Sequence, residues 1–371
     1  MAETIRMLKP DEVEELNRFL ERAYGHGYNF FRRNSSNIWP EKPEYCLVME
    51  NEGRIVGHVG TYPLELKVGS CTIPAGGIGA VAADPEHRGK GYMTRLMQQS
   101  IENMKGKGMV LSVLWGNRRR YSHFDYESCG LKYILNFSRS CFERSGTKPV
   151  QVREVNPKDP EVLRQVQSMQ STLYARVERK YPANLFGRPK VRVFLGSDGY
   201  LISLKETSGD LPVTEVVSPT GKEAELIYGA MNWTFGNSAA LEYASLPADA
   251  LNRLMEAAES WSLVPQGMFR IIDWFGLAKA LLPYFSESAE GLAPFELSIG
   301  CRWKEESQTV TLSWDGSNFS VSEGRYAEPY VELTARSLAG ALLGGPYDTR
   351  KLGPFAKILP VPIHLPNFDH V

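Results

Sequence analysis

A mixed fold of the α+β class, with mixed α/β sheets in more than one domain, is predicted by three observations. Strand-like and helix-like segments alternate along the chain. The stretch Ala80–Met104, AVAADPEHRGKGYMTRLMQQSIENM, places a glycine-containing loop between the end of an apolar strand and an amphipathic helix. The chain has 371 residues, which exceeds the usual size of one core, so two or three domains are expected.

The glycine loop has the features of an anion site. Gly89 and Gly91 precede a helix whose apolar residues share one face, namely Met93, Leu96, Met97, Ile101 and Met104. A helix start offers unpaired N–H groups and the positive end of the helix dipole, and glycine lets a phosphate come close to them. The loop has no GxxxxGK[ST] pattern, and it lacks the third glycine and the later acidic residue of a dinucleotide fingerprint.

Composition points to a small-molecule partner. The 42 basic and 43 acidic residues give a net charge of -1, so neither nucleic acid nor an anionic membrane surface is an expected partner. The five cysteines form no CxxC pair and are expected to be reduced and buried. No HExxH, paired His/Cys or DxDxDG spacing occurs, so no metal site is predicted. The charged N-terminus and the lack of a long apolar run predict a cytoplasmic protein.

Residues 1–144 are predicted to form the first domain. A strand is expected at Thr4–Leu8, followed by a helix from Pro10 with its apolar face at every third or fourth residue. After the glycine loop and its helix, another apolar strand, a polar bend with a short helix and a last strand complete this domain. The expected strands are Tyr45–Met49, Ile55–Tyr62, Leu64–Val68, Cys71–Ala82, Met109–Trp115 and Leu131–Phe142.

Residues 150–275 restart a similar pattern after the linker Ser145–Pro149, and they are predicted to form a second domain. Helices are expected from Asp159 and over Pro247–Trp261. Strands are expected at Gly199–Lys205, Val213–Val217, Glu225–Ala230 and Phe269–Asp273. No RxxG loop lies between the strand and helix at Leu241–Leu254, so a second copy of the fold would lack the anion site.

Residues 276–371 are predicted to form a third, smaller domain. An apolar helix leads into alternating strands with Asp315–Gly316 as a hairpin turn, followed by a helix over Thr334–Leu343. The expected strands are Glu296–Trp303, Thr309–Trp314 and Phe319–Val321. The tail from Pro346 has five prolines but also many apolar residues, so it is expected to pack along the protein.

Two motifs carry a resemblance to a known family. Arg88-x-x-Gly91 in VAADPEHRGKGYM resembles the acyl-coenzyme A pyrophosphate loop of the GCN5-related N-acetyltransferases (GNAT). Farther along, Tyr121-x-x-Phe124-x-Tyr126 resembles a segment of the enhanced intracellular survival (Eis) acetyltransferases, with Ser and Asp here at two positions where that family has glycine. The resemblance implies tandem GNAT domains at 1–144 and 150–275, and a sterol-carrier-like (SCP2-like) domain at 276–371.

The same resemblance implies the chemistry. Acetyl-CoA would be the co-substrate, Tyr121 the general acid, and the C-terminal carboxylate of Val371 the general base. The backbone N–H of Val81 would bind the developing oxyanion, and the strand backbone would pair with the pantetheine arm. The residues expected to bind the cofactor are Val81, Ala82, Ala83, Arg88, Gly89, Lys90, Gly91, Tyr92, Met93 and Asn117.

The acceptor implied by the family is a small-molecule amine, polyamine-like or aminoglycoside-like, and the implied assembly is a homo-oligomer such as a hexamer. Several residues keep two interpretations. Tyr126 is a rival to Tyr121 as the acid. The arginines at 118–120 are either contacts for the coenzyme A 3′-phosphate or a solvated turn. The aromatic residues after the first helix wall an acceptor pocket or form a core: Tyr24, Tyr28, Phe30, Phe31 and Trp39.

Two histidines beside the motifs, His87 and His123, look like candidate bases, but we interpret both as surface residues. Two alternatives of a different class also remain open at this stage. One is a non-catalytic regulator that binds acyl-CoA at the glycine loop. The other is a carrier of an apolar ligand that works through the last domain.

Overall fold

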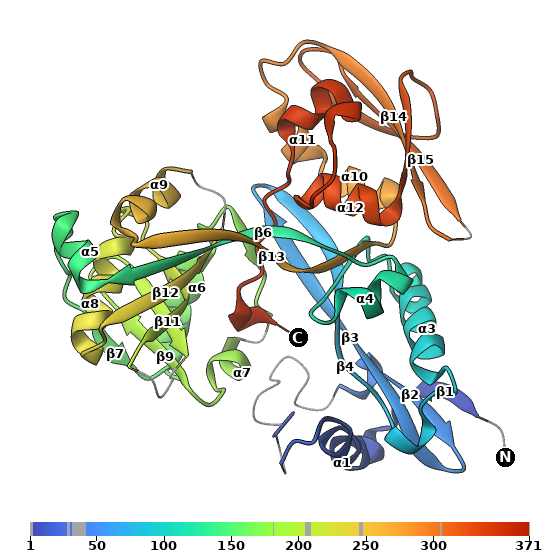
Figure 1. Ribbon diagram of the computed structural model, residues 1–371, viewed down its shortest axis with the longest axis horizontal. Coiled ribbons are helices and arrows are strands. Elements are labelled where there is room, and N and C mark those ends of the chain that lie inside the picture. Colours follow the sequence, from blue (N-terminus) through green and yellow to red (C-terminus); the bar gives the residue numbers. More distant parts are fainter. Residues whose placement is uncertain are drawn as a thin grey trace. The chain divides into compact units, whose positions relative to one another are not determined.

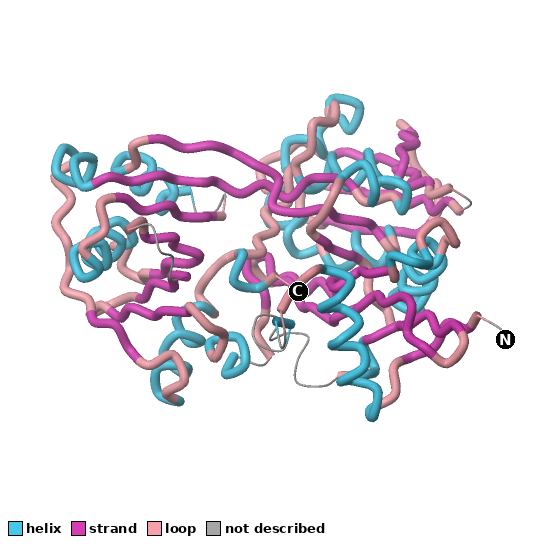
Figure 2. Tube along the Cα trace, turned by 60° about the horizontal axis from the view of Figure 1, so that its bottom comes forward, coloured by secondary structure: helices cyan, strands magenta, loops and turns pink. Residues whose placement is uncertain are grey.

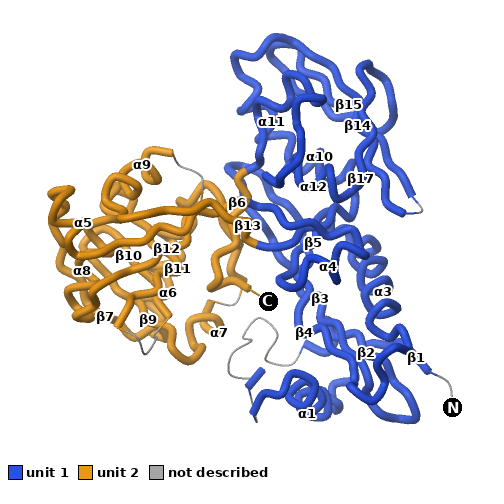
Figure 3. The backbone as a smooth tube through the Cα atoms, in the orientation of Figure 1, with its two compact units in different colours: residues 1–130, 267–361, 371 blue, residues 131–266, 362–370 orange. Residues whose placement is uncertain are grey.

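The computed structural model describes residues 3–27, 30–31, 42–180, 182–204, 209–244, 248–304 and 306–370. The chain divides into two compact units (Figure 3). Unit 1 comprises residues 1–130, 267–361 and 371, and unit 2 comprises residues 131–266 and 362–370. The chain passes from unit 1 to unit 2 within strand β6 (Glu127–Ser138) and returns within strand β13 (Ser260–Ile271). Helices and strands are mixed in each unit (Figure 2).

The main sheet of unit 1 has the strand order β1-β2-β3-β4-β5-β13. Its neighbouring strands are antiparallel except for β4 and β5, which are parallel and are joined by helix α3 (Figure 3). The strands and helices of this part are β1 (Thr4–Met7), α1 (Val13–Tyr24), β2 (Cys46–Asn51), β3 (Arg54–Val68), β4 (Cys71–Ala83), α3 (Tyr92–Gly106), β5 (Leu111–Leu114) and α4 (Arg118–Tyr121), with short 3₁₀ turns at Pro10–Glu12, Pro43–Tyr45, Pro85–His87 and Ser122–Phe124.

The two helices α1 and α3 cover opposite faces of this sheet. Neighbouring strand residues point to opposite faces, and on β3 Ile55 packs with the α1 cluster while Val56 packs with the α3 cluster. The predicted stripe of α3 is buried at Leu96, Met97 and Met104, which confirms the amphipathic helix. The predicted face of α1 is confirmed in the same way, since Val13, Leu16 and Leu20 are buried.

Strands β4 and β5 separate partway along their length. Their pairing covers only Ala75–Ile78 against Leu111–Leu114. Just beyond this point the β3–β4 register shifts between His58 and Gly60, and Ala80 has a φ of 49°. An extra residue on one strand of a pair is a β-bulge, which bends the strand and redirects its backbone groups. The backbone of β4 after Ile78 is therefore not paired with β5.

Unit 1 also contains a second, smaller sheet with the order β16-β15-β14-β17. Its three predicted strands and the turn at Asp315–Gly316 are confirmed, and β17 is an addition that the sequence did not reveal. The elements are α10 (Trp274–Ala280), α11 (Leu282–Ser288), β14 (Phe295–Arg302), β15 (Ser307–Trp314), β16 (Phe319–Glu323), β17 (Tyr330–Thr334), α12 (Ala335–Leu343) and a 3₁₀ segment at Arg350–Ile358.

Unit 2 has a sheet with the order β6-β12-β11-β10-β9-β7. Strands β11 and β12 are parallel, and helix α8 joins them. The elements of this unit are α5 (Arg139–Arg144), β7 (Arg153–Val155), α6 (Pro160–Gln170), β8 (Ala175–Val177), α7 (Pro182–Phe186), β9 (Val191–Leu195), β10 (Tyr200–Leu204), β11 (Leu211–Val217), α8 (Glu223–Thr234), β12 (Ser238–Tyr243) and α9 (Ala248–Ala257), with a 3₁₀ turn at Asn367–Asp369.

Two predictions for this region were wrong. The segment Glu225–Ala230 is part of helix α8, not a strand, and most of its residues are buried. Periodicity cannot separate a short apolar strand from a helix that is buried on most sides, which explains the error. The helix expected over Pro247–Trp261 ends at Ala257, and Trp261 already belongs to β13. Ser260 and the residues after it pair as a strand because a sheet neighbour is present, which local pattern does not show.

The proline-rich tail packs as predicted. Leu365 and Phe368 are completely buried in unit 2. The side chain of Gln266 donates to the Ile363 carbonyl (2.6 Å) and accepts from the Leu365 N–H (2.8 Å). In the described part of the chain, no helix has both the length and the apolar character needed to span a membrane.

Candidate active site

The loop between β4 and α3 adopts a conformation that requires its glycines. Gly89 and Gly91 have φ values of 82° and 74°, a region that residues with a Cβ rarely adopt. Gly91 is the N-cap of α3, and no side chain caps the helix there. A Cβ at either position would meet nothing within 4 Å. The start of α3 therefore has no side-chain acceptor at its cap, and there is open space beside both glycines.

A cavity of about 720 Å³ lies at this helix start. Eight of the ten residues predicted to bind the cofactor line it: Val81, Ala82, Ala83, Arg88, Gly89, Gly91, Tyr92 and Met93. Ala23, Tyr24, His87 and Arg120 complete the lining. The structure thus brings together the end of β4, the glycine loop and the start of α3 around one space.

The other two predicted cofactor residues do not line this cavity. The Lys90 ammonium lies 6.0 Å from the centroid of the Tyr92 ring. The Asn117 side chain accepts a hydrogen bond from the Arg120 N–H (3.2 Å) and caps the short helix α4. Asn117 therefore has a structural role at the start of α4, a role that the motif comparison did not indicate.

The bulged end of β4 is held by two side chains from neighbouring elements. His58 of β3 is fully buried, and its Nδ1 lies 2.8 Å from the Ala80 carbonyl oxygen. The Tyr24 hydroxyl, at the end of α1, donates to the Val81 carbonyl (2.8 Å). Burial raises the pKa of Tyr24 to about 12, so this hydroxyl keeps its proton. No sequence signal marked His58, and Tyr24 stood out only as one of several aromatic residues.

The side chain of Tyr92 is used inside the fold. Its hydroxyl donates to a carboxylate oxygen of Glu3 (2.6 Å), and Arg95 donates to the other oxygen of the same group (2.7 Å). This cluster ties the N-terminal strand region to the first turn of α3. The Tyr92 hydroxyl is therefore engaged inside the fold, and a ligand at the helix start would contact the backbone of Tyr92.

Tyr121, the predicted acid, is buried at the end of α4. Its ring packs on Gly116, where a Cβ would come within 2.5 Å of a ring carbon, so glycine is needed for this placement. Burial raises the pKa of Tyr121, and the neighbouring Arg120 guanidinium opposes that rise. The presence of Tyr121 also contributes to the raised pKa of Tyr24. Tyr121 thus lies near two residues that line the cavity and is protonated at neutral pH.

Tyr126, the rival acid, is committed to the core. It is fully buried, and its hydroxyl lies 2.7 Å from Ser112 Oγ. Because Ser112 Oγ donates to the Gly76 carbonyl (2.9 Å), Tyr126 is the donor in the first of these bonds. Burial raises the pKa of Tyr126 to about 12. Of the two tyrosines, Tyr121 is the one with cavity-lining neighbours.

Two of the three adjacent arginines have different roles. Arg118 donates twice to the buried carboxylate of Glu127 (2.5 and 2.9 Å), which also accepts from Arg336 and from the Tyr347 hydroxyl (2.7 Å). Burial alone would raise the pKa of Glu127, but these donors lower it to about 2. Arg118 therefore fixes α4 to the rest of unit 1, whereas Arg120 lines the cavity. The sequence did not separate these functions.

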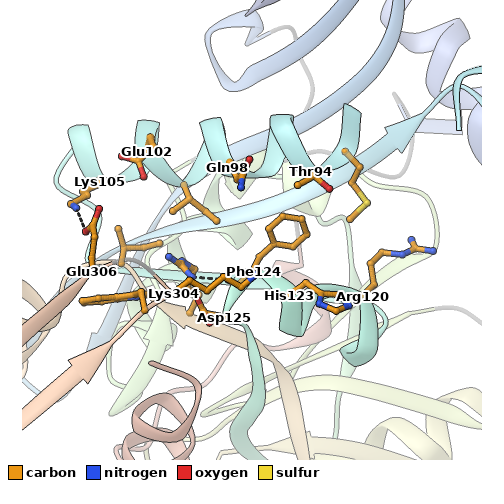
Figure 4. Close-up of a pocket in the computed structure, with 15 residues that line it drawn as sticks. Thr94, Gln98, Glu102, Lys105, Arg120, His123, Phe124, Asp125, Lys304 and Glu306 are labelled. Carbon is orange, nitrogen blue, oxygen red and sulfur yellow. Dashed lines mark hydrogen bonds and ion pairs between the residues drawn. The ribbon is translucent and has the colours of Figure 1, made fainter. Parts of the chain in front are cut away.

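A second cavity, of about 390 Å³, lies between α3 and the segment that follows α4, and it shares Met93 and Arg120 with the first. Figure 4 shows Thr94, Gln98 and Glu102 on the helix side and His123 and Phe124 across from them. His123, interpreted from the sequence as a surface residue, lines this cavity. Its remaining walls include Ile101, Ile272 and Trp303, and Lys304 lies at the same site.

Two ion pairs cross this second cavity. Arg270 donates to the Asp125 carboxylate (2.9 Å) and to the Phe124 carbonyl (2.7 Å), and Lys105 donates to Glu306 (2.6 Å). The first pair holds the loop after α4 to β13, and the second holds the loop before β15 to α3. The cavity therefore combines apolar walls with two positively charged side chains, Arg120 and Lys304, that do not belong to these two pairs.

Part of the expected acceptor region is described. The Tyr24 and Phe31 rings meet edge to face with centroids 5.4 Å apart, and the His26 and Phe30 rings stack at 3.8 Å. Phe31 is buried, while Tyr24 and Phe30 keep 43% and 36% of their surface exposed, so this group is neither wholly core nor wholly surface. Tyr28, Trp39 and Val371, the predicted base, lie outside the described residues.

Residues 4–129 match the family model of the acetyltransferase (GNAT) domain. This places the N-terminal part of the chain in the GNAT acetyltransferase family and identifies the protein as an acetyltransferase. A comparison with curated proteins found no match to the chain.

Solved structures share the fold over nearly the whole chain. A GCN5-related N-acetyltransferase from Kribbella flavida is 19% identical, with a TM-score of 0.72 and coverage of 98% of this chain and 97% of that one. One from Anabaena variabilis is 16% identical, with a TM-score of 0.72 and 98% coverage of both chains. Eis1 from Mycobacterium abscessus is 14% identical, with a TM-score of 0.67 and coverage of 94% and 91%. At such identities the similarity concerns the fold, and it confirms the predicted mixed α/β class.

Proposed function

We propose that this acetyltransferase transfers the acetyl group of acetyl-CoA to the amine of a small molecule. The observation that carries the proposal is the cavity where the uncapped start of α3, Arg88 and the end of β4 that β5 does not pair meet. A positive helix end with free N–H groups suits a pyrophosphate, and an unpaired strand backbone suits an amide-bearing arm. Coenzyme A carries both groups next to each other.

The parts of the cofactor follow the cavity in order. The pyrophosphate would accept from the backbone N–H groups of Gly89–Met93, with Arg88 supplying positive charge. The pantetheine amides would pair with the backbone of Val81–Ala83, because β5 no longer occupies that edge of β4. This arrangement would bring the thioester beside Val81 and the α4 end that carries Tyr121.

The second cavity would take the nucleotide end. It adjoins the first through Met93 and Arg120, and its walls at Phe124 and Trp303 suit a flat base. Arg120 and Lys304 would attract the 3′-phosphate. The test is a comparison of acetyl-CoA with its analogue lacking the 3′-phosphate. We expect a lower affinity for the analogue with the wild-type protein, and a smaller difference in an R120A/K304A variant. An equal difference in both proteins would remove these two residues from the phosphate site.

The reaction would be direct attack of a neutral amine on the thioester carbonyl. The carboxylate of Val371, with a pKa of about 3.5, would take the proton that the ammonium loses. The Val81 N–H would stabilise the tetrahedral oxyanion, and Tyr121 would protonate the departing coenzyme A sulfur. The C–N bond forms first and gives the tetrahedral intermediate, and the C–S bond breaks when this intermediate collapses. The nitrogen then loses its second proton to solvent, and solvent returns a proton to Tyr121.

The acceptor class and the domain plan are part of the same proposal. The shared fold with Eis1 of Mycobacterium abscessus supports an Eis-like enzyme with domains at 1–144, 150–275 and 276–371, the last of them sterol-carrier-like. The aromatic rings of Tyr24, Phe30 and Phe31 would favour a cationic polyamine-like or aminoglycoside-like acceptor. A cytoplasmic homo-oligomer, such as a hexamer, is the assembly we expect, and light scattering of the purified protein would test it.

Replacement of the proposed acid tests the mechanism. We expect Tyr121→Phe to lower kcat by about 100-fold while the affinity for acetyl-CoA stays the same, because general acid catalysis typically contributes about 10²–10⁴-fold. The measurement is steady-state release of free thiol with spermidine and with kanamycin as acceptors, beside calorimetric titration with acetyl-CoA. Tyr126→Phe is the matched control, since its hydroxyl faces Ser112, and it should keep kcat. An unchanged kcat in Tyr121→Phe would remove the acid assignment.

A further inference from the structure

We propose that His58 is a positioning residue for the acyl site. Its imidazole holds the bulged peptide between Ala80 and Val81, and this keeps the Val81 N–H directed at the thioester oxygen. The inference rests on the proposed function, because it assigns His58 a role in the binding of the oxyanion by that N–H.

The first step is the geometry of one peptide unit. The carbonyl of Ala80 and the N–H of Val81 belong to the same planar trans peptide, so they point in opposite directions. His58 Nδ1 lies 2.8 Å from the Ala80 oxygen. A hydrogen bond to one end of a rigid plane therefore sets the direction of the other end.

The second step is the unusual conformation of that peptide. Ala80 has a φ of 49°, in the left-handed region that a non-glycine residue occupies only at a free-energy cost. The β3–β4 pairing shifts register at the same place. A strained residue at a bulge relaxes unless its surroundings hold it. The buried hydrogen bond at the Ala80 carbonyl therefore stabilises this conformation.

The third step concerns the histidine. His58 is completely buried, and its Nε2 has no hydrogen-bond partner among the described residues. Burial lowers the pKa of His58 to about 4, so near pH 7 the ring is neutral and carries one proton. Because a carbonyl oxygen only accepts, that proton is on Nδ1. Its contact with Ala80 is thus the hydrogen bond that explains a polar ring at this depth.

The fourth step is that the next peptide is held as well. The Tyr24 hydroxyl donates to the Val81 carbonyl (2.8 Å). Two successive carbonyls of the bulge are therefore tied to two different elements, β3 and α1. The backbone between them lines the cavity proposed for acetyl-CoA. Such preorganised donors act on a charge that develops in the transition state without having to reorient.

The test begins with three substitutions of His58, assayed with acetyl-CoA and spermidine or kanamycin. The side-chain amide nitrogen introduced by H58N would occupy the place of the imidazole Nδ1, whereas the longer side chain of H58Q extends beyond it and that of H58L has no donor. We expect H58N to keep kcat within about threefold of wild type, and H58Q and H58L to lose about 10- to 100-fold. The KM for acetyl-CoA should stay within about twofold in all three, because the lost contact forms in the transition state.

A second comparison separates positioning from packing. Glycine adopts a positive φ without strain, so A80G in the H58L background should recover part of the kcat that H58L loses. A ring that served only to fill space would not be rescued in this way. If H58L does not fold, the H58N and H58Q pair decides the question on its own.

The outcomes are distinct from failure of the proposed function. If the wild-type protein neither binds acetyl-CoA nor releases thiol, the proposed function is wrong, and so is the role of His58 that depends on it. If the wild type is active but H58Q and H58N have equal kcat, or A80G gives no rescue, the positioning role alone is overturned.

Discussion

Unit 1 and unit 2 contain the same strand–helix–strand motif, but only the first opens onto the proposed cofactor cavity. In unit 1, parallel strands β4 and β5 are joined by α3. In unit 2, parallel strands β11 and β12 are joined by α8 (Figure 1). The two helices differ mainly in how they begin, and this comparison shows what a helix start needs before it can bind an anion.

The start of α8 carries negative charge of its own. The Lys222 N–H donates to Ser218 Oγ (3.1 Å), and the Lys222 ammonium pairs with Asp198 (3.3 Å). Two acidic residues, Glu223 and Glu225, occupy the first turn. Negative side chains at a helix start stabilise the positive dipole end and would repel a phosphate. Neither helix has a side-chain cap, but the first turn of α3 has no acidic residue, so its positive end is left for a ligand.

The largest expected difference between the two helix starts follows from a reversal of charge beside α3. Arg88→Glu puts a carboxylate at the proposed pyrophosphate site, so we expect the affinity for acetyl-CoA to fall by about 100-fold or more, or about 2.7 kcal/mol. Calorimetric titration measures this directly. The matched control is Lys222→Glu at the α8 start, where acetyl-CoA affinity should not change. A comparable loss in both variants would mean that the two loops do not differ in function.

A smaller difference is expected from backbone strain at one glycine in each of the two loops. Gly91 and Gly221 have φ values of 74° and 76°, so alanine should cost about 1 kcal/mol of stability at either position. Gly91→Ala should also weaken acetyl-CoA binding by about tenfold, because it disturbs the N-cap of α3. Gly221→Ala should lower the melting temperature at least as much, because its Cβ would lie 2.7 Å from a guanidinium nitrogen of Arg253, and it should leave binding unchanged. Equal binding by both variants would contradict the role of Gly91.

The smallest effect concerns the buried acid of α8. Burial raises the pKa of Glu223 above its ordinary value, and Arg253, 3.6 Å away, opposes the rise only partly. The folded state therefore holds its proton more tightly than the unfolded chain, so stability from this group is lost as pH rises through the folded pKa. Glu223→Gln should gain up to about 1 kcal/mol at pH 7 and nothing below about pH 4. Thermal unfolding at both pH values checks this, and a loss of stability at pH 7 would show that the ion pair with Arg253 outweighs burial.

Much of the proposed cofactor site could be predicted from the sequence because its residues are close together along the chain. The glycines, the stripe of α3 and the strand before them fall within Ala80–Met104, and local patterns report on local structure. Eight of ten predicted residues line the cavity for this reason. The cap that Asn117 provides for α4 was not foreseen, because a motif match does not tell whether a side chain caps its own helix or faces a ligand.

The sequence by itself determined the mixed fold class, the glycine loop and the amphipathic helices α1 and α3, because periodicity and glycine spacing act over a few residues. Only the tertiary structure decided what depends on distant neighbours. In the folded chain, His58 contacts the Ala80 carbonyl, and residues 225–230 form part of a helix. Arg118 pairs with Glu127, whereas Arg120 lines the cavity. A bulge, a buried hydrogen bond and the choice between strand and buried helix are settled by the elements packed around them, and no local pattern records those elements.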